Sequence, residues 1–175
     1  VLFLVCLFLV SEAGRVRMHA AAADMQHAMA RRILVGELRE RVTDAALAYQ
    51  AFLISGRSDT LEPLRTAGLR INGIADALVA SYQGEPGSIG TTARQLRYLA
   101  GVVTGAMATT ITLYASRGPV AALELARAQD PRANPVQNFL HVADKLERYE
   151  SARMRETRAN WQLETLVVRR LAAIA

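Results

Sequence analysis

Three histidines are the side chains in this sequence best suited to bind a metal: His19, His27 and His141. His19 and His27 are eight residues apart, which places them on roughly one face of a helix. Zinc sites need three or four side-chain ligands, and no acidic or cysteine partner completes such a set here. A di-iron bundle needs Glu-x-x-His pairs on facing helices, and the sequence has none. We therefore interpret the histidines as surface residues and predict neither a metal site nor a cofactor.

Two arginines are the candidates for ligand binding. Arg94 and Arg97 fall in the first turns of a predicted helix, where they could face an anionic ligand. The competing interpretation is a solvated helix face. Five tyrosines recur along the predicted helices, and we favour core or interface packing over a ligand cage for them: Tyr49, Tyr82, Tyr98, Tyr114 and Tyr149.

Catalytic motifs are missing from the sequence. It contains no glycine-rich phosphate loop, no nucleophile elbow and no pair of catalytic carboxylates. The one cysteine, Cys6, excludes a disulfide framework. We therefore predict that the chain itself is not an enzyme and has no catalytic residues.

Composition predicts a single helical domain. The 175 residues are 51% hydrophobic but only 6% aromatic, much of the apolar share is alanine, and no sustained alternation of β-branched and aromatic residues is found. The net charge of +5 comes from arginines scattered among glutamates, as in LERYESARMRETR. This pattern is typical of a helix surface with many ion pairs, and it argues against nucleic-acid binding, which favours clustered basic residues. The arginine and alanine content indicates a GC-rich bacterial genome.

The chain begins with an apolar run, VLFLVCLFLV, which is too short to cross a bilayer because a span needs about 20 residues. We interpret residues 1–14 as the C-terminal part of a transmembrane helix. The alternative is the apolar region of a signal peptide, but the charge of Glu12 disfavours cleavage there. Trp161 resembles an interfacial aromatic residue near a second membrane segment. Because Arg169 and Arg170 suit a membrane interior poorly, residues 171–175 are predicted to start that segment, which leaves 15–170 as the folded domain.

Glycine and proline residues mark the helix ends and loops of that domain. We expect a left-handed cap at Gly56, a cap for the next helix at Ser58 or Asp59, and loops over 83–88 and 130–135. A third helix is expected to close at Gly118, before Pro119. The resulting helices are 15–55, 60–81, 89–115, 120–128 and one from 136 that continues towards 175.

Apolar residues on the first helix recur at steps of three and four, as in a packed helix seam. Because the pattern is interrupted between Met29 and Leu38, we expect a shift in packing near Ile33 and Leu34. The methionines of the seam, Met18, Met25 and Met29, also suggest a homodimer. The seam residues are Met18, Ala22, Met25 and Met29, followed by Leu38, Val42, Ala45, Tyr49 and Phe52.

Helix lengths and short loops together predict the architecture. Short loops favour antiparallel neighbours. We therefore expect an antiparallel up-down-up-down four-helix bundle with long first and last helices, continuous with a membrane helix. Both chain ends would then emerge at the same end of the bundle.

Two stretches resemble CHASE3 sensor domains. They are ALAYQAFLISGRSDTLEPLRTA and ASRGPVAALELARAQDPRANPVQNFLHVADKLERYESARMRETR. The sensor bundle of chemoreceptors is the second family that the chain resembles. The resemblance implies a domain without enzymatic activity, held between two membrane helices of a two-component histidine kinase, a diguanylate cyclase or a chemoreceptor. It also implies a homodimer that relays an unidentified small-molecule or protein stimulus through helix shifts.

The expected location is the bacterial inner membrane, with the domain in the periplasm. Arg15, Arg17, Arg31 and Arg32 near the apolar run leave a cytoplasmic orientation as an alternative, because arginine-rich flanks favour the cytoplasmic side. Two other functions remain open. A membrane-anchored helical scaffold or adaptor would have no effector domain, and a helical cofactor bundle would bind a chromophore or metal.

Overall fold

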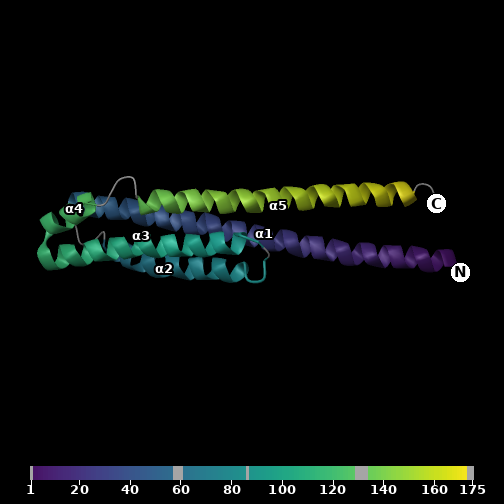
Figure 1. The fold of residues 1–175 in the computed structure, drawn as a ribbon, viewed down its shortest axis with the longest axis horizontal. Helices are drawn as coiled ribbons and strands as arrows, with labels where there is room; N and C mark the ends of the chain where they lie inside the picture. Colours follow the sequence, from purple (N-terminus) through teal and green to yellow (C-terminus); the bar gives the residue numbers. More distant parts are fainter. Residues whose placement is uncertain (1, 57–60, 86, 129–133, 173–175) are drawn as a thin grey trace. The chain divides into compact units, whose positions relative to one another are not determined.

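The computed structural model describes residues 2–56, 61–85, 87–128 and 134–172, with side chains described for 19–56, 64, 66–85, 87–126, 128 and 134–163. These residues are all-helical, with five helices and no strand, so the predicted fold class is confirmed at this level. The bounds agree closely with those expected, and the first helix begins inside the apolar run, at Leu2. In Figure 1 the helices are α1 (Leu2–Ser55), α2 (Leu61–Ser81), α3 (Ile89–Arg117), α4 (Pro119–Ala128) and α5 (Pro135–Ala172).

Contacts divide the chain into two compact units. The first unit combines Val1–Arg32 with Arg148–Ala175, and the second unit is Ile33–Glu147. Helices α1 and α5 therefore contribute to both units without a break, whereas α2, α3 and α4 belong to the second unit alone.

The second unit has one apolar core, to which four helices contribute. On each helix the buried side chains recur at steps of three or four, which keeps them on one face. Neighbouring α2 and α3 make many contacts with each other, as do α3 and α4. The core includes Val35, Leu38, Val42 and Phe52 of α1, Ile71 and Leu78 of α2, Leu96 and Val103 of α3, and Phe139 and Leu146 of α5.

Helix α1 ends at a glycine corner. Gly56 has a φ of 63°, the predicted left-handed conformation, and its N–H donates to the carbonyl of Phe52 over 2.8 Å. The Tyr114 hydroxyl donates to the Gly56 carbonyl over 2.8 Å, and the Tyr114 ring meets the Phe52 ring edge-on at a centroid distance of 4.5 Å. This corner therefore fixes the end of α1 to α3. The predicted caps at Ser58 and Asp59 lie outside the described residues.

Two further helix ends are set by turn residues. Gly118, with a φ of 82°, closes α3 by donating its N–H to the carbonyl of Tyr114, and Pro119 opens α4, as predicted. The side-chain oxygen of Asn134 accepts hydrogen bonds from the N–H groups of Val136 (3.0 Å) and Gln137 (3.4 Å). Asn134 is thus the N-cap of α5, a role that the sequence analysis had not assigned.

The buried face of α1 is more regular than predicted. Met29, assigned to the seam, is 60% exposed, so that assignment is wrong. Ala28, Arg31 and Val35 are buried instead, and they keep the steps of three and four through the apparent gap. The gap arose because an arginine occupies a seam position. The two units nevertheless divide between Arg32 and Ile33, next to the predicted shift.

The tyrosines occupy three kinds of environment. Tyr82 is buried, and Tyr49 and Tyr114 are partly buried against the core, whereas Tyr98 is 69% and Tyr149 is 40% exposed. Core packing is therefore confirmed for the first three, whereas Tyr98 and Tyr149 lie outside the core and their place in an interface stays a prediction. Burial raises the pKa of Tyr49, and the nearby Thr110 side chain opposes part of that shift.

One helix among the described residues, α3, is long and apolar enough to cross a membrane. Buried core helices meet the same criterion of length and composition, and α3 supplies Leu96, Ala100 and Val103 to the core of the second unit. The side chains of the run 1–10 lie outside the described residues. The membrane helix expected there, and the boundaries at 14 and 171, therefore stay predictions.

The glycine corner gives a first testable prediction. We expect Gly56→Ala to lower the free energy of unfolding by about 1–2 kcal/mol or more, because a left-handed non-glycine residue costs that much. The added Cβ would also lie 2.7 Å from the Tyr114 hydroxyl oxygen. Tyr114→Phe removes this clash, so it should cost less in the Gly56→Ala background than in the wild type. Urea denaturation of the four proteins measures the difference.

Gly73→Ala is the matched control. Gly73 lies inside α2 with open space around its Cα, so alanine should stabilise the helix by about 0.5–1 kcal/mol. Purely additive effects of Gly56→Ala and Tyr114→Phe would contradict the clash.

Candidate functional site: the groove between α1 and α5

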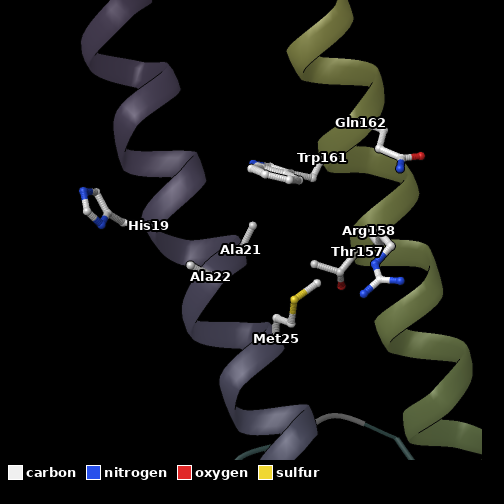
Figure 2. Close-up of a pocket in the computed structure, with 8 residues that line it drawn as sticks. All are labelled: His19, Ala21, Ala22, Met25, Thr157, Arg158, Trp161 and Gln162. Carbon is white, nitrogen blue, oxygen red and sulfur yellow. The ribbon is translucent and has the colours of Figure 1, made fainter.

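The candidate site is a cavity of about 600 Å³ in the first unit, between α1 and α5. Its volume is within the range of about 300–1,000 Å³ typical of small-molecule sites. Most of its wall is apolar. The lining residues are His19, Ala21, Ala22 and Met25 of α1 and Thr157, Arg158, Trp161 and Gln162 of α5 (Figure 2).

Helical spacing brings these residues together. Met25 follows Ala21 and Ala22 by four and three residues, and Trp161 follows Thr157 by four, so each set lies on one helix face. In Figure 2, Trp161 and Thr157 project from α5 towards α1, and Met25 projects from α1 towards α5. Because the small side chain of Ala21 stands opposite the indole ring, the helices leave space that a larger side chain would fill.

A buried ion pair joins the two helices in the same unit. Arg31 Nη1 on α1 lies 4.0 Å from Glu150 Oε1 on α5, and the two side chains are only 7% and 0% exposed. Opposite charges in so little solvent interact strongly, and removing one would take away part of the other's compensation. The residues had not been predicted as a pair. The signals for them are the gap in the α1 seam at Arg31 and the position of Glu150 four residues after Leu146 on the α5 seam.

A second ion pair lies closer to the groove. Arg153 Nη2 is 3.9 Å from Asp24 Oδ1, with the two side chains 26% and 59% exposed. Exposed pairs of this kind contribute little to stability. This pair therefore helps to align α1 with α5 but does not provide most of the attraction.

The predicted ligand-binding arginines lie elsewhere. On α3, Arg97 forms an ion pair with Asp76 of α2, and both side chains are 56% exposed. Arg94 Nη2 donates to Thr91 Oγ1 over 3.0 Å. Neither arginine lines the groove between α1 and α5, and their ligand-binding role stays a prediction.

The exposed pair between Arg97 and Asp76 yields a second prediction. We expect Arg97→Ala to change the free energy of unfolding by no more than about 1 kcal/mol, because solvent screens the pair and ordering two side chains costs entropy. Chemical denaturation at low and high salt measures the change, which should shrink further at high salt. A loss of about 3 kcal/mol would mean that Arg97 has a structural role beyond this pair.

The histidines do not form a cluster. His19 lines the groove, but in Figure 2 its ring lies on the side of α1 away from α5, and His27 and His141 are exposed. Within the described residues, no group of three or more histidine, cysteine or acidic side chains is placed to hold a metal ion.

The sequence analysis singles out two residues of the groove but does not predict that they lie in the same site. Trp161 was interpreted as a membrane-interface residue and His19 as a surface residue. The two residues line the same groove because of how α1 packs against α5, and that packing cannot be predicted from either residue alone. Comparison with known proteins adds no further identification: no family model, curated protein or solved structure matches the chain, so its resemblance to CHASE3 domains stays a prediction.

Proposed function

We propose that the chain is the extracytoplasmic signal-input domain of a bacterial membrane receptor, resembling CHASE3 domains, whose output belongs to a histidine kinase, a diguanylate cyclase or a chemoreceptor. The observation that carries the proposal is the continuity of α1 and α5, which each contribute to both units. A helix that is unbroken between a packed core and an apolar run can transmit a small shift along its axis.

The proposed topology is an antiparallel up-down-up-down order of α1, α2, α3 and α5, with α1 continuous with a membrane helix. Contacts inside the second unit support this order. The ends of α1 and α3 meet at Phe52 and Tyr114, as expected for two helices that run in the same direction. Arg39 of α1 pairs with Asp144 (3.0 Å) and Glu147 (3.4 Å) of α5.

The proposed signal is a change in the packing of α1 against α5. In the first unit, the buried pair of Arg31 and Glu150 favours a particular alignment of the two helices, because a buried charge separated from its partner is costly. Packed helices also tend to switch between discrete arrangements. A stimulus that favours one alignment would therefore be passed on as a two-state shift.

We further propose that the receptor is a homodimer. Ile33, Leu47 and Ile54 of α1 are 62%, 60% and 88% exposed. They are separated by multiples of seven residues, so they share one face of the helix, directed away from the core of the second unit. Exposed apolar residues on one face are typical of a helix that packs against a partner.

Cysteine labelling tests the location. The only native cysteine is Cys6, so Gln95→Cys introduces a second thiol at an exposed position of α3. We expect a membrane-impermeant maleimide to label this variant in intact cells that express the chain in the inner membrane. Labelling of the wild-type chain corrects for Cys6. Labelling of Gln95→Cys only after lysis would support the cytoplasmic orientation instead.

A chimeric kinase distinguishes a sensor from a scaffold. The chain replaces the sensor domain of a membrane histidine kinase that has a transcriptional readout, and residues are inserted in α5 between Ala159 and Asn160. Seven inserted residues nearly preserve the direction in which the downstream helix face points. Four inserted residues turn that face to a different direction. A sensor should change its basal output more with four residues than with seven. Equal output from both, and from an inert coiled coil in the same place, would favour the anchored scaffold.

A further inference from the structure

The net charge of the chain is concentrated in the unit that contains the groove. Val1–Arg32 and Arg148–Ala175 hold ten arginines and five acidic residues, which accounts for the whole net charge of +5. The acidic and basic residues of Ile33–Glu147 balance. A groove in a positively charged unit favours the approach of anions.

The charged side chain at the groove also favours an anion. Arg158 supplies hydrogen-bond donors, and no carboxylate is among the described residues that line the groove. The Thr157 hydroxyl already donates to the Arg153 carbonyl over 3.0 Å, and Gln162 lies on the side of α5 away from α1 (Figure 2). Arg158 is exposed and forms no ion pair with any described side chain. Its guanidinium is therefore available to a carboxylate or sulfonate, which it can bind through two parallel hydrogen bonds.

The apolar part of the groove favours a flat ring. Trp161 is 50% exposed and projects from α5 towards α1, opposite the small side chain of Ala21 (Figure 2). A half-exposed indole ring offers a stacking surface for another aromatic ring, and such pairs gain beyond simple burial. Met25 adds a polarisable thioether, which also contacts aromatic rings favourably.

We propose that this groove binds an amphipathic aromatic anion, with a planar ring system against Trp161 and a carboxylate or sulfonate on Arg158. The inference rests on the proposed function and gives the stimulus a chemical class. A neutral planar molecule would lack the contact with Arg158, and an aliphatic anion would lack stacking. Both should bind more weakly than an aromatic anion of similar size.

The test uses the full chain in nanodiscs of zwitterionic lipid and isothermal titration calorimetry with 2-naphthoate. We expect saturable binding with one site per chain, and binding weaker by about tenfold for neutral 2-naphthalenemethanol, since a hydrogen bond to a charged group is lost. Decanoate is the aliphatic anion. Decanoate binding as tight as that of 2-naphthoate would overturn the aromatic specificity and indicate a lipid-like ligand.

Matched variants locate the binding site. Ala21→Leu fills the cavity and should weaken 2-naphthoate binding by about tenfold, whereas Ala23→Leu, an exposed alanine outside the lining, should not. Arg158→Gln should weaken binding of 2-naphthoate but not of the neutral alcohol. Arg155→Gln removes the same charge from an exposed position outside the lining and is its control.

Equal effects of Arg158→Gln and Arg155→Gln would mean that only the overall charge matters, and they would overturn the site. Absence of 2-naphthoate binding would overturn the proposal as well. Neither result depends on the receptor function, because the chimeric kinase reports that function without any ligand. A chimera that responds to helix insertion while the chain binds no 2-naphthoate would leave the sensor intact and refute only the groove as its aromatic-anion site.

Discussion

Replacing Glu150 by alanine is expected to lower the free energy of unfolding by about 3–5 kcal/mol, because it leaves the buried charge of Arg31 without this partner. The Glu150 side chain is 0% exposed and the Arg31 side chain is 7% exposed, so water cannot replace the lost carboxylate without a rearrangement. Thermal and urea denaturation of the full chain would measure the loss. Hydrogen exchange would place it at α1 and α5 in the first unit.

A double variant separates the charge effect from the loss of packing. In Arg31→Met with Glu150→Leu, both charges are replaced by apolar groups of similar size, and stability should return close to that of the wild type or exceed it. Glu147→Ala is the matched control. Glu147 also pairs with an arginine, Arg39, but their side chains are 30% and 45% exposed, so we expect a loss of about 1 kcal/mol or less. Equal losses for Glu150→Ala and Glu147→Ala would contradict a structural role for the buried pair.

The same pair would matter to the proposed signalling. If the alignment of α1 with α5 carries the signal, the apolar double variant should fold well and yet show altered basal output in the chimeric kinase, because apolar contacts specify register less strictly. Wild-type output from that variant would assign the pair to stability alone.

The helices and most of their ends were predictable because the signals for them are local. A glycine at 56 and a glycine–proline pair at 118 and 119 constrain the backbone whatever surrounds them, and both mark helix ends in the structure. The buried seam was predictable only in part. Arg31 was overlooked because a pattern of apolar residues does not count an arginine, although this arginine is buried opposite a carboxylate.

The groove was harder to predict because it is a property of two helices together. Ala21 and Ala22 are unremarkable in an alanine-rich segment, and Trp161 lies far from them in the sequence. Only the packing of α1 against α5 shows that the alanine segment leaves space beside the indole ring.

Arg94 and Arg97 were candidates because they are close in sequence. In the structure, Arg94 bonds to Thr91 of its own helix and Arg97 pairs with Asp76 of α2.

Replacing Phe52 by alanine is expected to cost about 3–5 kcal/mol of unfolding free energy, the range for removing a large buried aromatic side chain. Phe52 is 0% exposed, and its ring meets that of Tyr114 at 60° between planes. The substitution removes this edge-to-face contact and leaves a cavity beside the glycine corner. Tyr114→Phe keeps the ring pair but loses the hydrogen bond to the Gly56 carbonyl, so it should cost only about 1 kcal/mol.

Ile54→Ala is the matched control for Phe52→Ala. Ile54 lies two residues further along α1 and is 88% exposed in the single chain, so its truncation should change the stability of the monomer, measured at low protein concentration, by about 0.5 kcal/mol or less. Urea denaturation of both variants gives the comparison, and hydrogen exchange should show lost protection in α1 near Phe52 and in α3 near Tyr114. A larger loss for Ile54→Ala at high protein concentration would place Ile54 in the interface of the proposed homodimer. The loss for Ile54→Ala should then depend on protein concentration, because a dimer contact stabilises the fold by mass action.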